Sequence, residues 1–300
     1  MIASLPFRTR CASLLLAVIA LLGISAGSVA YAAAIVSTAI PAEKKPDDIA
    51  LASHKALYEI SLAGTKSGSQ VVNVSGKMLY ETQASCDAWQ ASHQFNLFYE
   101  YADSPAMHVT SDFSTYEPFD GKSIDFNSRR TQDGQLVEEL RGSATLKADG
   151  SGEAIYTMPK GLEYDLAPGS LFPMGHTLSV IKAIRDNKKF MNASVFDGSD
   201  EEGPIEISSF VGKPVPTPDH FKSDELFDQK LLSSPAHSIR LAYFPLGESG
   251  ESADYEMDVV FHENGIISDM VIEYDDFTVT QKLVALEALP DACPAKVQAR

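Results

Sequence analysis

The 300-residue chain carries 24 Lys and Arg against 41 Asp and Glu, which gives a formal net charge of −17 at pH 7. So acidic a chain excludes nucleic acid as a partner and argues against electrostatic docking on anionic membranes, because both reward basic surfaces. A hydrophobic share of 44% over this length is enough for a large domain with its own core.

The N-terminal segment is typical of a secretory signal peptide. Arg8 and Arg10 form its positive region, and the apolar core from Leu14 to Ile24 is too short to span a bilayer. Small residues then mark two candidate cleavage sites, near Ala30 and near Ala34. An uncleaved membrane anchor is the alternative, since the apolar stretch can be extended. We therefore expect an exported protein of the periplasm.

The cysteines allow one disulfide once Cys11 leaves with the signal peptide. Cys86 and Cys293 then remain, so one connectivity is possible. An oxidising compartment such as the periplasm lets this bond persist, and it would close most of the domain into one loop, with a stabilisation of up to roughly 5 kcal/mol. Two buried free thiols are the alternative. A redox-active pair is disfavoured because no C-x-x-C motif is present.

Short alternating segments dominate the chain from His54 onward. Ala56, Tyr58 and Ile60 alternate with more polar neighbours, as in a strand with one buried face. Turn dipeptides separate the later segments, and Asn264-Gly265 is the strongest hairpin signal. About 14 antiparallel strands are predicted. Beyond the opening strand and the run that begins at Val71, they are expected at 90–101, 107–116, 122–130, 136–140, 144–148, 153–158, 190–197, 205–213, 238–246, 252–262, 266–274 and 277–286.

One helix interrupts this rhythm. Leu178, Ile181 and Ile184 recur at helical spacing, and basic residues follow them where a helix C-terminus favours positive charge. The pattern predicts a helix from about His176 to Asp186 that plugs one mouth or face of the sheet. It is entered through a proline-containing loop.

Two further segments bear on the architecture. Three prolines in residues 213–218 predict an extended path outside the sheet, and residues 219–232 form either a short second helix or a loop.

A sheet of so many strands must close on itself to hide its edges. We predict an all-β fold with one or two helices, a single antiparallel β-spiral or barrel-like domain wound around a helix; two sandwiches split near Pro214 are the alternative. The predicted organisation is a signal peptide (1–34), a flexible leader (35–53), the β domain (54–293) and a C-terminal tail (294–300).

No motif for catalysis or metal binding stands out. The hydrolase motif G-x-S-x-G and the zinc motif H-E-x-x-H are both absent. His176 at the predicted helix start and Phe172 in the loop before it are candidate binding or structural residues. Trp89, with Phe95, Phe98, Tyr99 and Tyr101, either lines an apolar pocket or packs in the core. We expect neither a cofactor nor catalytic residues.

Three stretches carry a resemblance to a known family. They are HKALYEISL at 54–62 with SGKMLYETQASCDAW at 75–89, LAPGSLFPMGHT at 166–177, and ALPDAC at 288–293. Together they resemble the EipB family of cell-envelope integrity proteins. The resemblance implies a periplasmic β-spiral around a helix, with Cys86 and Cys293 at the positions of the family's disulfide. It also implies a non-enzymatic role in envelope integrity under stress, and a periplasmic tetratricopeptide-repeat protein as partner.

The function that follows is a binding or scaffold module among envelope proteins. A periplasmic carrier of a lipid, an acyl chain or another apolar ligand is the alternative, because the strands are rich in aromatic residues and could enclose a hollow interior. The ligand expected for either role is a lipid or a peptidoglycan-associated ligand, and the likeness of the implied fold to lipoprotein-carrier barrels suggests binding. A hydrolase of envelope polymers that uses His176 and an unidentified carboxylate is the least favoured hypothesis. Whether the interior of the barrel is hollow decides between these hypotheses.

Overall fold

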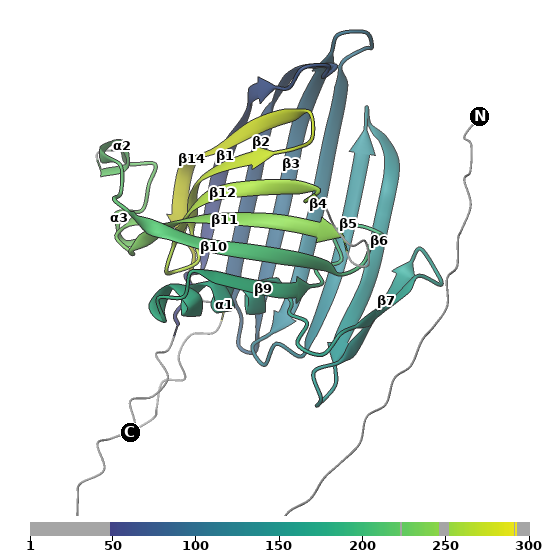
Figure 1. Ribbon diagram of the computed structural model, residues 1–300, viewed down its shortest axis with the longest axis vertical. Helices are drawn as coiled ribbons and strands as arrows, with labels where there is room; N and C mark the ends of the chain where they lie inside the picture. Colours follow the sequence, from purple (N-terminus) through teal and green to yellow (C-terminus); the bar gives the residue numbers. More distant parts are fainter. Residues whose placement is uncertain (1–48, 223, 246–251, 291, 293–300) are drawn as a thin grey trace, which may run out of the picture. The chain divides into compact units, whose positions relative to one another are not determined.

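The computed structural model describes residues 49–222, 224–245, 252–290 and 292. The predicted signal peptide with both cleavage sites, Cys293 and the C-terminal tail lie outside these residues. In the described part, 14 strands form one continuous antiparallel sheet in the order β8-β7-β6-β5-β4-β3-β2-β1-β14-β13-β12-β11-β10-β9 (Figure 1). The strands are β1 (His54–Thr65), β2 (Val71–Ala84), β3 (Ala88–Tyr101), β4 (Met107–Pro118), β5 (Ser123–Gln132), β6 (Gln135–Leu146), β7 (Gly152–Met158), β8 (Glu163–Leu166), β9 (Phe190–Val195), β10 (Ile205–Val215), β11 (Ala236–Pro245), β12 (Tyr255–His262), β13 (Ile267–Glu273) and β14 (Phe277–Ala288).

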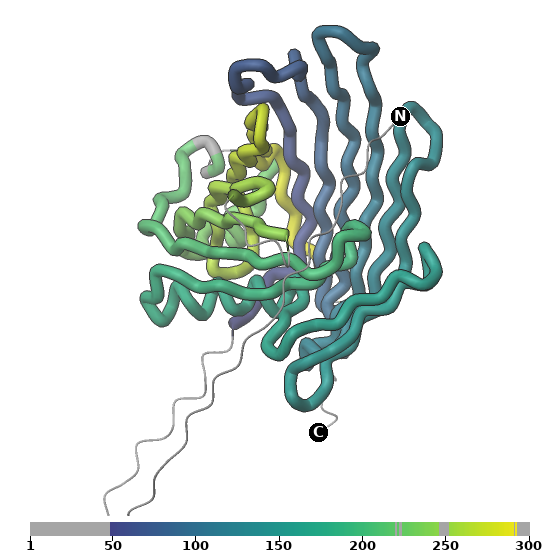
Figure 2. Tube along the Cα trace, turned by 45° about the vertical axis from the view of Figure 1, so that its right-hand side comes forward, coloured from purple at the N-terminus to yellow at the C-terminus, as the bar shows by residue number. Residues whose placement is uncertain are grey.

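The pairing of β1 with β14 makes this sheet a spiral. Every other pair joins strands that follow each other in the chain, so the sheet grows from β1 toward β8 in one direction and from β14 toward β9 in the other. Strands β9 to β12 cross the face of β1 to β4, and Figure 2 shows the two halves as facing walls. The predicted single wound domain is therefore confirmed, and a split into two sandwiches near Pro214 is wrong for the described residues.

The core lies between the facing walls, as the alternating pattern requires. In β1 the side chains of Ala56, Tyr58 and Ile60 are buried while their neighbours are more exposed. They join the main hydrophobic cluster with Ile207 and Ile239 of the other wall. Alternation thus carries the apolar face of each strand inward.

A second hydrophobic cluster lies under β5 to β8. Phe126 and Tyr156 pack there against Phe196, which directly follows β9. The loop after β9 packs closely on this cluster: an added Cβ at Gly198 would lie 2.3 Å from the Phe126 ring. Gly198 also has a φ of +72°, which favours glycine. A glycine is therefore required at this position.

Helix α1 (Pro173–Arg185) begins three residues before the predicted start. Proline is favourable in the first turn because its missing N–H would have no partner there. Its buried residues include Ile181 and Ile184, so the predicted apolar face is correct. The helix turns into β9 through Asn187, whose φ is +55°.

One prediction for the segment after residue 205 needs correction. Strand β10 continues through Pro214 to Val215, whereas an extended path outside the sheet was expected. A register shift between Val211 and Pro214 makes room for the proline, which lacks a backbone donor. The next segment forms two one-turn helices, α2 (Asp219–Lys222) and α3 (Gln229–Leu232). No helix within the described ranges is long and apolar enough to cross a membrane.

Candidate functional site

An apolar groove of about 430 Å³ opens on the inner face of β3 to β6. The strand register arranges its side chains in rows: Phe95 lies opposite Ser111, and Leu97 lies opposite Val109. Most of the lining comes from β3 and β4, with β5 and β6 closing one side. The lining residues are Phe95, Leu97, Tyr99, Tyr101, Met107, Val109, Ser111, Arg130, Gln132 and Val137.

The groove continues from the core toward the open end of the sheet. Phe95, Leu97, Tyr99 and Tyr101 are partly buried and pack against the main hydrophobic cluster. At that end the opposing wall, β9 to β14, leaves the inner face of β3 to β6 uncovered enough for a groove to form. An interior that is packed at one end and open at the other follows from this arrangement.

A row of neighbouring aromatic rings lies on the opposing wall. The Tyr243 and Tyr255 ring centroids are 4.3 Å apart, those of Tyr255 and Tyr274 are 5.9 Å apart, and those of Tyr274 and Phe277 are 4.8 Å apart. Burial raises the pKa of Tyr274 to about 12, and the nearby Tyr99 of the groove adds to this rise. The aromatic wall therefore lies beside the groove and extends its apolar character.

One ion pair interrupts the apolar lining. Arg130 Nη1 lies 3.3 Å from Glu138 Oε2. The other carboxylate oxygen, Glu138 Oε1, is buried and has no hydrogen-bond partner among the described residues. Long apolar walls with one charged pair suit a ligand that has an apolar body and a polar end.

The aromatic residues singled out from the sequence divide between different places. Phe95, Tyr99 and Tyr101 line the groove. Phe98 is 46% exposed on the opposite face, where its ring stacks on His108 at 4.3 Å. Adjacent strand residues point to opposite faces, so Phe98 cannot share a pocket with the odd-numbered residues of β3. The structure places Trp89 at the other end of β3, edge-on to Phe119 at 5.6 Å.

The two remaining candidates lie at the start of α1, away from the groove lining. Phe172 is 1% exposed and fills the second hydrophobic cluster. His176 Nε2 is buried without a hydrogen-bond partner in the described part of the chain, and burial lowers the pKa of His176 to about 4. The described residues include no group of His, Cys, Asp and Glu side chains that could hold a metal ion.

Glu117 of β4 makes a structural contact that the sequence does not reveal. It is 2% exposed, and its carboxylate accepts hydrogen bonds from the backbone N–H groups of Met174 at 2.9 Å and Gly175 at 3.0 Å. Burial raises the pKa of Glu117 to about 7, although these two hydrogen bonds oppose the rise. Because Phe172 supplies no side-chain cap, Glu117 satisfies the start of α1 from a distant strand. No local pattern signals such a contact.

Cys86 lies in the turn between β2 and β3. The C-terminal segment runs beside this turn, because the backbone N–H of Ala292 donates to Ala84 O at 2.9 Å and Gln83 Nε2 donates to Pro290 O at 2.6 Å. The residue before Cys293 is therefore bonded to a residue two positions before Cys86. The pairing itself stays a prediction, since Cys293 lies outside the described residues.

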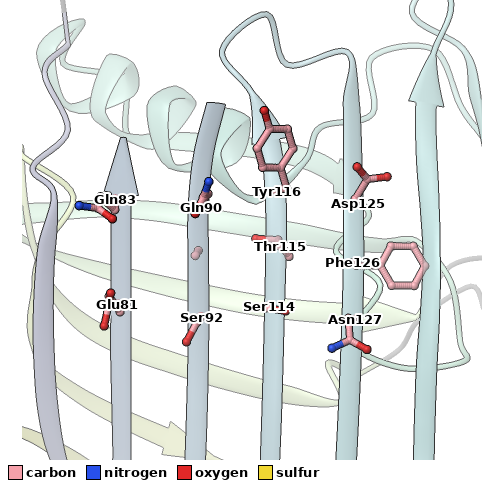
Figure 3. A pocket seen from close by; sticks show the side chains of 11 residues that line it. Glu81, Gln83, Gln90, Ser92, Ser114, Thr115, Tyr116, Asp125, Phe126 and Asn127 are labelled. Atoms are coloured by element: carbon pink, nitrogen blue, oxygen red, sulfur yellow. The ribbon is translucent and has the colours of Figure 1, made fainter. Parts of the chain in front are cut away.

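A second depression lies on the outer face of the sheet, with a volume of about 480 Å³. Figure 3 shows its polar side chains in rows across β2 to β5, for example Gln83, Gln90, Tyr116 and Asp125. Such side chains are satisfied by water, whereas the inner groove leaves apolar surface accessible. We therefore take the inner groove as the candidate site.

A sheet wound on itself around one helix, with an apolar groove on its inner face, defines a barrel-like β protein. The model of the EipB-like family matches residues 46–290, so the chain belongs to the EipB-like family. It is 28% identical over 242 residues to the cell envelope integrity protein EipB of Brucella abortus (strain 2308), a match that covers 80% of this chain and 85% of that protein. The crystal structure of a beta-barrel-like protein of domain of unknown function DUF1849 from Brucella abortus matches with a TM-score of 0.75 and 27% identity, over 81% of this chain and 100% of that one. The predicted family is confirmed.

Proposed function

We propose that the chain supports the integrity of the cell envelope from the periplasm, and that it does so by binding. The identity of 28% to the cell envelope integrity protein EipB supports the envelope role. The signal-peptide pattern of the first 34 residues supports the compartment. Both statements concern where the protein acts and what it maintains.

A non-enzymatic mode of action agrees with the chemistry of the groove. Apart from two tyrosines, Arg130 is the one ionisable residue among the described lining residues, and it is paired with Glu138. A general acid and base need two positioned titratable groups facing the substrate. His176, the histidine that a hydrolase would use, has a buried Nε2 with no hydrogen-bond partner among the described residues.

The groove is the observation that supports a specific ligand class. Its volume of about 430 Å³ lies within the usual range of small-molecule sites, roughly 300 to 1,000 Å³. The walls offer Phe95, Leu97, Met107 and Val109 to an apolar body, and the Arg130 pair offers hydrogen bonds to a polar end. A lipid or an acyl chain fits this lining better than a peptidoglycan-associated sugar, whose hydroxyl groups would need more polar partners.

A fluorescent fatty acid tests this proposal with a matched pair of variants. Leu97 lies in the groove and Phe98 points to the opposite face of the same strand. Leu97→Glu buries a charge in the groove, whereas Phe98→Glu adds the same charge outside it. We expect the delipidated chain and Phe98→Glu to bind the probe, and Leu97→Glu to lose at least tenfold in affinity.

Thermal melts of both variants separate loss of the site from loss of the fold. Equal affinity for the two variants would remove the groove as the binding site. Failure of the unmodified chain to bind any fatty acyl probe would remove the ligand class.

A protein partner remains part of the proposal. The family resemblance implies a periplasmic tetratricopeptide-repeat protein, and a scaffold role would need such a contact. Crosslinking in intact cells, followed by purification of this chain, tests it. Recovery of such a protein with Leu97→Glu as well as with the unmodified chain would place the contact away from the groove.

A further inference from the structure

Two phenylalanines on neighbouring strands protrude from the outer face. Phe190 of β9 is 72% exposed and Phe210 of β10 is 43% exposed. The register pairs these residues directly, and their ring centroids are 4.9 Å apart. Single exposed apolar side chains are ordinary, but covering an exposed aromatic pair removes a larger apolar surface from water and lowers the free energy. Such a pair therefore indicates an interaction surface.

Basic residues lie close to this pair along the chain: Lys188 and Lys189 directly precede Phe190, and Lys213 follows Phe210 by three residues. The patch is contiguous along the backbone: the N–H of Lys188 donates to Ala183 O at 2.9 Å, and the N–H of Val211 donates to Lys189 O at 2.9 Å. We define the basic aromatic patch as Lys182, Arg185, Lys188, Lys189, Phe190, Phe210 and Lys213.

The charges of the patch are only partly balanced. Asp186 Oδ2 lies 3.1 Å from Lys182 Nζ and 3.8 Å from Lys188 Nζ. Arg185 Nε lies 3.2 Å from Glu263 Oε2. Five basic residues thus face two acidic ones. Lys182 and Arg185 also complement the negative end of α1, but the other three lysines lie outside the helix and need another explanation.

The rest of the outer face has the opposite character. Phe210 pairs with Arg240 of β11, and Arg240 is surrounded by Glu256 at 2.6 Å, Asp258 at 2.5 Å and Glu273 at 3.5 Å. The patch therefore ends at β10, and acidic surface begins two strands further on. In a chain with a net charge of −17, a negative surface would attract this patch and repel its surroundings. The distribution of charge would therefore orient the protein on such a surface, with the patch facing it.

We propose that the basic aromatic patch docks this protein on the surface of an anionic phospholipid bilayer. Lysines attract anionic headgroups, and aromatic rings insert at the boundary between headgroups and acyl chains. A protein interface explains the composition less well, because such interfaces are depleted of lysine and use arginine instead. The global charge argues against membrane docking, but the local charge favours it. This inference does not rest on the proposed groove ligand.

Vesicle flotation with the exported chain tests the proposal. We expect binding to phosphatidylglycerol vesicles at low salt, little binding to phosphatidylcholine vesicles, and release as the salt concentration rises. Lys188→Gln combined with Lys189→Gln is expected to lower the partition coefficient about 25-fold, at about fivefold for each lysine near the surface. Phe190→Ser is expected to weaken binding while leaving its salt dependence unchanged.

The matched control removes two lysines elsewhere. Lys147 and Lys160 are exposed in the turns on either side of β7, at the opposite end of β9 from the patch in Figure 1. Lys147→Gln combined with Lys160→Gln should bind vesicles as the unmodified chain does. No binding to phosphatidylglycerol, equal binding to phosphatidylcholine, or equal loss in the control would each overturn the proposal. A protein requirement for vesicle binding would overturn it in favour of a protein partner.

Discussion

The replacement Glu117→Gln tests whether burial or helix capping dominates the pKa of the Glu117 carboxyl group, which caps the start of α1. Burial raises the pKa of Glu117 from 4.5 to about 7. Between these values the folded chain keeps the proton that the unfolded chain has lost, so this group stabilises the fold at low pH. The stabilisation is lost as the pH rises through about 7.

The magnitude follows from linkage. A shift of 2.5 pKa units, from 4.5 to about 7, makes the free energy of unfolding fall by about 2.5 kcal/mol between pH 5 and pH 8, as an upper limit for this group. Glutamine imitates the protonated carboxyl group and does not titrate. Glu117→Gln should therefore match the unmodified chain within about 1 kcal/mol at pH 5, and be the more stable of the two at pH 8.

Urea unfolding of both proteins at pH 5 and pH 8 measures this difference directly. The comparison cancels every other titrating group that the two proteins share. A difference that is constant with pH, or one that favours glutamate at pH 8, would refute the reasoning. A constant difference would mean that the N–H groups of Met174 and Gly175 and the helix dipole, which lower the pKa of a carboxyl group, cancel the effect of burial. A preference for glutamate at pH 8 would mean that they outweigh it.

Three further predictions concern stability. Cys86→Ser and Cys293→Ser should each lower the free energy of unfolding by a similar amount, roughly 2 to 5 kcal/mol, with no further loss in the double variant; additive losses in urea unfolding would contradict a shared bond. Burial lowers the pKa of His176 to about 4, so its contribution to stability should be present above pH 6.5 and lost as the pH falls toward 4. His176→Gln should flatten the melting temperature over that window, and an unchanged profile would argue against it. Phe172→Ala should cost about 3 to 5 kcal/mol because the ring is fully buried, and a loss below about 1 kcal/mol in urea would contradict its place in the second cluster.

Local patterns predicted the elements of the fold well. The alternation around Tyr58 gives the buried face of β1, and Asn264-Gly265 marks the turn between β12 and β13, where Gly265 has a φ of +89°. The helical spacing of Ile181 and Ile184 gives the buried face of α1. Each of these signals acts within a few residues, so the sequence alone displays it.

Contacts between elements that are distant in the chain could not be predicted from the sequence. The helix starts earlier than predicted because Glu117 caps it from β4, and β10 continues past Pro214 because a register shift accommodates the ring. Alternation places Phe95, Tyr99 and Tyr101 on one face, but only the winding of the sheet decides whether the opposing wall covers them. The groove is thus a property of the whole spiral.

Native mass spectrometry of the protein purified from the cells that produce it tests the central claim most directly. We predict that the intact chain and Phe98→Glu carry the added mass of a lipid or an acyl chain, and that Leu97→Glu carries none. Bare protein mass for the intact chain, or the same added mass on Leu97→Glu, would contradict binding in the inner groove.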